Sequence, residues 1–218
     1  MNFEQMLIGS YLLKPSLFFT VEISREHFRD DIAGKAYDAI KAEEEYEDME
    51  VGVYFTLNML WYHYVTLEEE GIYDFIVGDG DLNATLDFLG GSAYPMGPGD
   101  LFENPGEITQ NPEYFIYGMN ATALPFQIPE TGWSSEDVTF PGNVVIESDE
   151  REQQGYVTVL QNFAFAASVP VIWNVLHDIT EEPEFIPFHN PYGIFQDMGL
   201  WNEDFSDEKE VWDTWCGP

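Results

Sequence analysis

The feature that most restricts the fold is a series of β-forming segments and turns between residues 118 and 176. Val138, Thr139 and Phe140 make one short run of β-branched and aromatic residues, and a longer run covers residues 156–160. Proline, glycine, asparagine and aspartate bound both runs, which is the residue chemistry of strands separated by turns. We therefore predict that this part of the chain is mostly β-structure.

The charge of the chain is strongly acidic and unevenly distributed. Its 218 residues include 41 Asp and Glu against 7 Lys and Arg, and the formal net charge is −34. No Lys or Arg lies between residues 42 and 150, a span with 23 acidic residues. Such a span repels nucleic acid phosphates and disfavours its own compaction at low salt. Four interpretations stay open: a surface adapted to high salt, a channel wall for sliding DNA, a DNA mimic and a metal-binding surface.

The composition predicts one folded domain, or one domain with a large insertion. Hydrophobic residues make up 44% of the chain and aromatic residues 16%, which is enough for a core and excludes a disordered acidic tail. The single cysteine, Cys216, excludes an intramolecular disulfide framework and a multi-cysteine zinc site. Without a signal pattern or a long apolar run, we expect a protein kept in the cytoplasm or assembled there, with no membrane partner.

Local patterns along the chain predict helices and a long loop. Apolar spacing predicts a helix over residues 29–42, leaves residues 51–65 open between strand and buried helix, and places a helix start near Pro170. Glycine, proline, aspartate and asparagine dominate residues 72–118, which we interpret as a long functional or partner-bound loop.

Catalytic and metal-binding patterns are weak. There is no nucleophile-and-base motif and no paired-histidine metal motif, so the sequence predicts neither an enzyme nor a cofactor. One segment places oxygen ligands at alternate positions, as a calcium loop does, but Ala84 stands where the loop needs glycine and Gly90 where it needs a bidentate glutamate. The weak calcium candidates are Asp79, Asp81, Asn83 and Asp87.

Several segments, in their order and spacing, resemble the tail tube and tube-initiator proteins of contractile bacteriophages. They are Thr122-Ala123-Leu124-Pro125, the run Val138-Thr139-Phe140, the turn Asp149-Glu150-Arg151, the run from Val157 to Asn162, and Trp173. The resemblance implies an α+β fold with an antiparallel β-sandwich or barrel-like core, a packed helix and a large mixed insertion. It implies a first helix and first core strand in 1–28, an acidic insertion in 29–112, and a β-rich core with an aromatic and acidic C-terminal segment in 113–218. It also implies a structural virion protein, made in the host cytoplasm, whose acidic lumen conducts DNA without binding it directly.

The same resemblance implies partners and contact residues. Copies of the chain would form a ring, and other tail or baseplate proteins would bind that ring. Leu124 and Pro125 would form a turn near a subunit contact. The aromatic residues Trp201, Trp212 and Trp215 would either cap the core or anchor a neighbouring subunit.

The first 45 residues carry a second, weaker resemblance, to the N-terminal domain of replicative DNA helicases. Its residues include Glu4, Gln5, Leu7, Ile8 and Gly9, then Glu26-His27-Phe28 and Ala36-Tyr37-Asp38. The chain has no phosphate-binding loop of the G-x-x-x-x-G-K-[ST] type, so a helicase motor is excluded. The alternative function is therefore an acidic DNA mimic, or an inhibitor that binds a replication partner.

Overall fold

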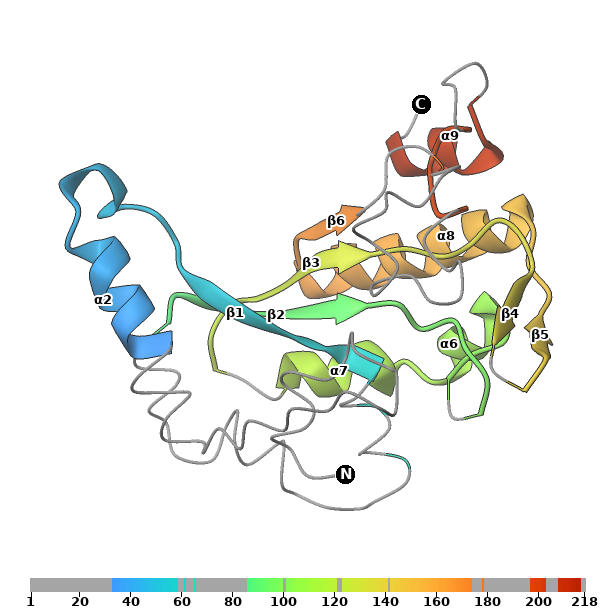
Figure 1. Cartoon of the computed structure of the whole chain (residues 1–218), viewed down its shortest axis with the longest axis horizontal. Helices are drawn as coiled ribbons and strands as arrows, with labels where there is room; N and C mark the ends of the chain where they lie inside the picture. Colours follow the sequence, from blue (N-terminus) through green and yellow to red (C-terminus); the bar gives the residue numbers. More distant parts are fainter. Residues whose placement is uncertain are drawn as a thin grey trace.

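The computed structural model describes residues 33–58, 61, 65, 86–99, 101–120, 123–140, 142–173, 178, 197–202 and 208–216. Figure 1 shows the elements in these ranges. In chain order they are α2 (Lys35–Lys41), η2 (Glu44–Tyr46), β1 (Gly52–Thr56), β2 (Phe88–Ala93), α6 (Pro105–Gln110), α7 (Glu113–Asn120), β3 (Phe126–Thr131), β4 (Val138–Phe140), β5 (Val144–Ile146), α8 (Glu150–Ala167), β6 (Val171–Trp173) and α9 (Glu210–Cys216).

The main sheet has four strands in the order β1-β2-β3-β6, and all of the pairs are parallel. Helices α6 and α7 connect β2 to β3, and α8 lies in the connection from β3 to β6 (Figure 1). Each of these crossovers moves one strand further in the same direction. Because crossovers between parallel strands are right-handed, this order places the connecting helices on one face of the sheet. It is the arrangement of a sector of a (β/α)8 barrel.

The sequence of β2 allows the neighbouring strands to approach closely. A Cβ on Gly90 would lie 2.9 Å from the Tyr54 Cβ, and one on Gly91 would lie 2.5 Å from the Leu57 side chain. The two glycines are adjacent and therefore point to opposite faces of the sheet. Larger side chains at either position would push the side chains of the β1 region away from β2.

Helix α8 contradicts the prediction of a strand over residues 157–162. Its N-cap Asp149 accepts hydrogen bonds from the backbone N–H groups of Arg151 and Glu152 at 2.9 and 3.0 Å. Its buried residues have the i, i+3, i+4, i+7 spacing of one helical face, and burial of that face overrides the β preference of valine and threonine. The buried residues are Gln153, Tyr156, Val157 and Leu160.

The predicted helix start near Pro170 is also wrong. Helix α8 ends at Ala167, and Ser168 follows in the left-handed conformation, with φ 56°. Pro170 then leads directly into β6, where its carbonyl accepts a hydrogen bond from Ile128 N at 2.9 Å. This proline therefore separates a helix from a parallel strand, and residues before proline favour extended conformations.

Strand structure is confirmed at residues 138–140 but in a different place in the fold. Val138–Phe140 forms β4, which pairs antiparallel with β5 in a separate two-stranded sheet. Gly142 and Asn143, both with positive φ, lie in the connecting turn, and these residue types adopt that conformation readily. The strand is thus part of a hairpin between β3 and α8 rather than of the main sheet.

The predicted α+β fold with an antiparallel sandwich or barrel-like core is wrong, because the main sheet is entirely parallel. Residues 51–65, left open above, begin as β1 and turn helical at Leu57. A helix is confirmed within residues 29–42, as α2. Both β1 and β2 fall in the region predicted to be an insertion, and β2 pairs with β3 of the region predicted to be the core. The region 1–28 lies outside the described residues.

The core lies between the sheet and its helices and is rich in aromatic residues. Trp133, Tyr114, Tyr156 and Phe115 are its largest fully buried side chains. Phe115 of α7 stacks on Phe163 of α8 with 4.8 Å between ring centroids, so these two helices lie side by side. Among the helices that the structure describes, none is long and apolar enough to cross a membrane.

Candidate functional site

The carboxyl ends of the four parallel strands meet along one edge of the sheet. In barrels and open α/β sheets, ligands bind at this edge, where the loops that follow the strands converge. Here the edge is formed by the ends of β1, β2, β3 and β6 at Thr56, Ala93, Thr131 and Trp173. The acidic side chain within these strand ends is Glu130, the penultimate residue of β3. We therefore take this edge as the candidate site.

A bulge determines the face of the sheet on which Glu130 lies. The β2–β3 ladder pairs Gly90 with Gln127 but Ser92 with Glu130, so β3 has one extra residue between these pairs. Without the extra residue, Glu130 would lie opposite Ala93, whose side chain is buried in the core. Bulges of this kind re-aim side chains and are frequent next to active sites.

The face that carries Glu130 is the one turned away from α8. Tyr54, Gly90 and Pro129 share this face, since a Cβ on Gly90 would contact both Tyr54 and Pro129. Tyr54 is 55% exposed. Glu130 itself is half-buried, and its Oε2 atom is inaccessible to solvent. The carboxyl group thus lies at the strand ends with one oxygen inside the protein.

Thr131, the next residue, points to the opposite face and joins three elements. Its Oγ1 donates a hydrogen bond to the Ala93 carbonyl of β2 at 2.7 Å and lies 2.7 Å from the Tyr156 hydroxyl of α8. Burial raises the pKa of the Tyr156 phenol, so this hydroxyl keeps its proton and remains a hydrogen-bond donor. The end of β3 is therefore tied to both β2 and α8.

The end of β1 is connected to the same edge by an asparagine. Asn58 donates from its side-chain amide to the carbonyl of Tyr94, which directly follows β2. The hydroxyl of buried Tyr114, on α7, donates to the Asn58 side-chain oxygen. These two bonds use both ends of the amide, so they orient Asn58 and join β1, β2 and α7 next to the candidate site.

The loop after β3 is held by the buried indole and carbonyl of Trp133. Its Nε1 donates to Ser148 Oγ at 3.1 Å, and its carbonyl accepts from Gln153 Nε2 at 2.9 Å. Gln153, fully buried on α8, also donates to the carbonyl of Gly199 at 3.2 Å. A single glutamine side chain thus connects the loop after β3 to the segment 197–202.

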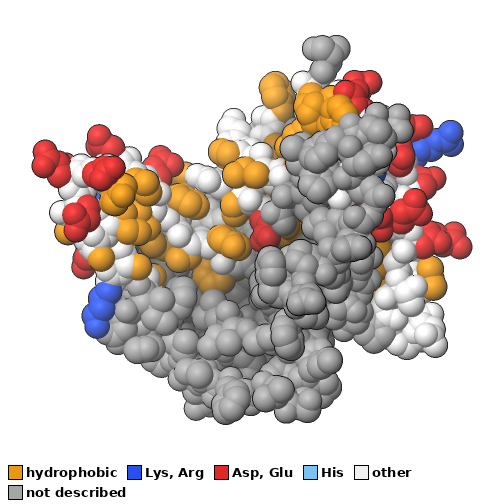
Figure 2. Space-filling view, turned by 45° about the horizontal axis from the view of Figure 1, so that its top comes forward, with side chains coloured by type: hydrophobic (Ala, Val, Ile, Leu, Met, Phe, Trp, Pro, Cys, Tyr) orange, Lys and Arg blue, Asp and Glu red, His pale blue; other side chains and the backbone are white. Residues whose placement is uncertain are grey.

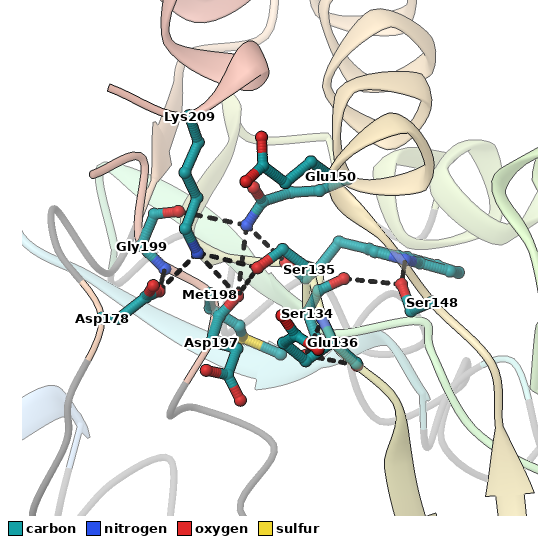
Figure 3. Close-up of polar contacts among 12 residues, drawn as sticks. Ser134, Ser135, Glu136, Ser148, Glu150, Asp178, Asp197, Met198, Gly199 and Lys209 are labelled. Atoms are coloured by element: carbon teal, nitrogen blue, oxygen red, sulfur yellow. Dashed lines mark hydrogen bonds and ion pairs between the residues drawn. The ribbon is translucent and has the colours of Figure 1, made fainter. Parts of the chain in front are cut away.

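A buried lysine makes a second connection between these segments. Lys209 Nζ lies 2.6 Å from Asp178 Oδ1 and donates to Ser135 Oγ at 2.7 Å (Figure 3). Ser135 Oγ in turn donates to the carbonyl of Asp197 at 3.0 Å. A serine next to a lysine can be a nucleophile with its base, but here the hydroxyl proton is directed to a carbonyl and the lysine to a carboxylate. The cluster is a structural support for the site.

Ionisation of the Asp197 carboxyl group should lower the stability of the folded state as the pH rises. Burial raises the pKa of its carboxyl group, repulsion from Asp178 raises it further, and Lys209 opposes both. The folded state therefore holds this proton more tightly than the unfolded state, and stability is lost as the pH rises from the usual aspartate range through the raised pKa. We expect Asp197→Asn to raise the melting temperature at about pH 7 and to leave it unchanged at about pH 3, where both states are protonated.

The control for this prediction is Asp213→Asn. Asp213 lies exposed on α9, and its replacement removes the same charge from the chain. If both variants raise the melting temperature at neutral pH by equal amounts, relief of general repulsion explains the effect. Melting curves of both variants at the two pH values distinguish these outcomes.

The surface around the sheet combines acidic and apolar areas. In Figure 2, Asp and Glu side chains crowd two margins of the view, and hydrophobic side chains gather between them. Exposed hydrophobic residues in and before β1 include Tyr46, Met49 and Tyr54. The described surface therefore has an apolar area that lies between two negatively charged areas.

The structure describes the five predicted contact residues but only one of the four calcium candidates, Asp87. Leu124, Trp201, Trp212 and Trp215 are half-buried and pack against the core, while Pro125 is exposed. Their role in contacts between subunits stays a prediction. The three others, Asp79, Asp81 and Asn83, lie outside the described residues.

The fourth calcium candidate, Asp87, is described and contacts a lysine. It forms an ion pair with Lys41 at 2.9 Å and accepts hydrogen bonds from Val51 N and the Tyr37 hydroxyl. Its hydrogen bond to Lys41 is the main cause of its lowered pKa. Within the part of the chain that is described, no group of three His, Cys, Asp or Glu side chains is placed to hold a metal ion.

Sequence reasoning missed Glu130, although a signal was present. The segment from Phe126 to Trp133 places a carboxylate at the end of a run with buried Phe126 and Ile128, directly before Thr131 and Gly132. A carboxylate at the carboxyl end of a parallel strand is typical of catalytic sites in barrel enzymes. That signal depends on knowing that the strand is parallel, which the predicted antiparallel core excluded.

Comparison with known proteins shows a shared fold but no matching family. No protein-family model and no curated protein matches the sequence. The chain does share its fold with solved structures of glycoside hydrolases. At identities of 12 to 16%, this likeness shows the fold alone.

Three of these structures illustrate the likeness. A glycoside hydrolase family 17 β-1,3-glucanosyltransferase from Rhizomucor miehei has a TM-score of 0.52 at 12% identity, over 88% of this chain and 58% of its own. An endo-laminarinase from Formosa has a TM-score of 0.57 at 16% identity, over 93% and 55%. A fungal β-1,4-galactanase has a TM-score of 0.53 at 12% identity, over 84% and 52%. The chain thus spans little more than half the length of each.

These comparisons overturn the resemblance to phage tail tube proteins. The similar folds are those of a β-1,3-glucanosyltransferase, a laminarinase and a galactanase, and they support neither the structural virion function nor its DNA-mimic alternative. The prediction that the chain is not an enzyme is contradicted too. The physical reason is that the matched segments were short patterns that several folds share, and residues 157–162 are helical here. The predicted ring partners and virion location are not tested by these structures.

Proposed function

We propose that this chain carries a glycan-processing site of the glycoside hydrolase type at the carboxyl edge of its parallel sheet. The observation that carries the proposal is the position of Glu130, which the β3 bulge turns to the face away from α8 at the strand ends. The likeness to glycoside hydrolase folds supports it. Glu130 is the residue to which we assign the chemistry.

The chemistry of glycoside hydrolysis suits this position. Most glycosidases use two carboxyl groups across the scissile bond, one as acid and the other as nucleophile or base. Such a carboxyl group must be held in one orientation and must be accessible to the sugar. Glu130 lies on a strand rather than on a mobile loop, half-buried, with one inaccessible oxygen. Glu130 therefore supplies one of the two carboxyl groups, the acid or the nucleophile or base.

The charge of the chain favours an uncharged glycan as substrate. With a formal net charge of −34, the protein repels polysaccharides rich in carboxylates or sulfates. The printed names of the similar structures include a β-1,3-glucanosyltransferase with laminaritriose, a laminarinase and β-1,4-galactanases. A β-galacturonidase solved with galacturonate bound, a charged sugar, shares the fold as well. We infer that neutral β-linked glucans or galactans are the substrate class.

The test is a comparison of glycans that differ in linkage and charge. Laminarin, β-1,4-galactan and polygalacturonate are incubated with the purified chain, and new reducing ends and transfer products are measured. The proposal expects products from a neutral β-glycan and little or none from polygalacturonate. If no glycan is cleaved or elongated, the proposed function is wrong. If only polygalacturonate is cleaved, the inference on substrate charge is wrong.

A further inference from the structure

We propose that Thr131 and Tyr156 are positioning residues that hold the β3 bulge in the register that presents Glu130 at the site. This inference rests on the proposed function for its kinetic part, but its structural part can be tested without activity. It concerns residues that would not touch a substrate, since both are fully buried on the face opposite Glu130.

The first step of the argument is that two registers compete at the end of β3. In the observed register Glu130 is paired with Ser92 and Thr131 with Ala93. In a ladder without the bulge, Glu130 would be paired with Ala93. Because side chains alternate between the faces of a strand, a slip of one residue moves each of them to the other face. The slip would place the Glu130 carboxylate in the core, next to α8.

The second step is that the hydrogen bonds of the Thr131 and Tyr156 hydroxyls can form only in the observed register. Thr131 Oγ1 lies 2.7 Å from the Ala93 carbonyl oxygen, to which it can donate, and 2.7 Å from the Tyr156 hydroxyl, where either hydroxyl can be the donor. The Tyr156 oxygen also lies 3.3 Å from the Ala93 carbonyl oxygen. The two hydroxyl groups and the Ala93 carbonyl can thus hydrogen-bond with one another only when residue 131 lies opposite residue 93.

The third step is that the rest of the bulge is consistent with this register. Pro129 lies in it and has no N–H group to lose from the ladder, which is why prolines within sheets occur at bulges. Gly91, opposite the bulge, has no room for a side chain, because a Cβ there would lie 2.5 Å from Leu57 and 3.0 Å from Phe126. Neither residue contributes a side-chain hydrogen bond, whereas Thr131 and Tyr156 add polar contacts that favour the observed register.

The variant that tests the proposal is Thr131→Val, which keeps the shape of the side chain and removes the hydroxyl. A displacement of about 1 Å in a catalytic group can lower a rate about 100-fold. We expect kcat on the active glycan to fall by about 10-fold to 100-fold with KM nearly unchanged. Thr131→Ser restores the hydroxyl and should recover most of kcat. Tyr156→Phe removes the second hydroxyl but leaves the hydrogen bond from Thr131 to the Ala93 carbonyl, so it should give a smaller loss.

A matched control separates positioning from general stability. Ile108→Val shortens a fully buried side chain of α6, an element outside the β3 bulge, and lowers stability. It should leave kcat unchanged when measured well below its melting temperature. If Thr131→Val keeps the wild-type kcat, or if Ile108→Val loses as much, the positioning proposal is overturned.

The structural readout uses a thiol at the position of the carboxylate. In a Cys216→Ser background, which removes the exposed native thiol, the thiol of Glu130→Cys should react with a maleimide reagent. Adding Thr131→Val should slow this labelling severalfold, because the slipped register moves residue 130 towards the core. Equal labelling rates would overturn the register argument even if the wild-type chain were inactive on glycans. An inactive wild type with the expected labelling difference would instead overturn the proposed function alone.

Discussion

Glu130→Gln is expected to lower kcat on a neutral β-glycan by at least about 100-fold. The amide has the shape of the carboxylate, so the strand and its bulge should be retained, but it neither exchanges a proton at the reaction pH nor attacks a sugar carbon. KM should change little, because the side chain contributes more to the transition state than to binding of the ground state. The measurement is initial rates at several substrate concentrations, with reducing ends as the readout.

The control for this variant is Glu44→Gln. Glu44 lies in the exposed η2 segment, and its replacement removes the same negative charge from the chain. It should keep the wild-type rate. A Glu130→Gln protein that retains more than half of the wild-type kcat would contradict the assignment of this residue. An equal loss in both variants would attribute the effect to net charge.

Lys209→Met is expected to destabilise the fold by about 3–5 kcal/mol. The side chain of Lys209 is 7% exposed and that of its partner Asp178 is 15% exposed, with 2.6 Å between Nζ and Oδ1. Removing the lysine leaves the Asp178 carboxylate in a poorly solvated place without its cation, and Ser135 loses a hydrogen-bond donor. Urea unfolding followed by tryptophan fluorescence measures the change.

The chain provides a matched control in Lys41→Met. Lys41 forms an ion pair with Asp87 at 2.9 Å, but the two side chains are 23% and 28% exposed. A solvated pair of this kind contributes roughly 0.2–1 kcal/mol. Both variants remove one of 7 cations, so general repulsion changes equally. Equal losses in the two variants would show that burial of the Lys209 pair has no specific effect.

A second replacement identifies the cause of the Lys209 effect. In the Lys209→Met background, Asp178→Asn removes the unpaired charge and should recover part of the stability. The Asp178 carboxylate also accepts a hydrogen bond from Gly199 N at 3.0 Å, which the asparagine side-chain oxygen can keep. If the double variant is less stable than Lys209→Met, the destabilisation does not come from an unpaired carboxylate.

The difference between the predicted and the observed fold is clearest in residues 149–162. The sequence contained a capping aspartate at 149 and buried positions 153, 156, 157 and 160 at helical spacing. It also contained two valines and a threonine that favour strands. Periodicity over 18 residues and an N-cap indicate a helix more strongly than the intrinsic preference of three residues, since burial of one face dominates helix stability.

At residues 138–140, in contrast, the sequence predicted the local structure correctly but not its place in the fold. Its residue types and the turn residues Gly142 and Asn143 were sufficient to predict local strand structure. They carried no information on the partner strand. Pairing in a hairpin or in the main sheet depends on which hydrophobic face is buried against which helix, and that is a property of the whole fold.

By itself, the sequence determined the local and global properties that depend on residue types alone. These are the net charge of −34, the aromatic content that allows a core, the turn between β4 and β5, and the absence of a disulfide framework. The tertiary structure alone decided that the main strands are parallel, that Glu130 lies at their carboxyl edge, and that a bulge turns it away from α8. The reason is that parallel pairing joins segments far apart in the chain, and a shift of one residue in that pairing reverses the face on which a side chain lies.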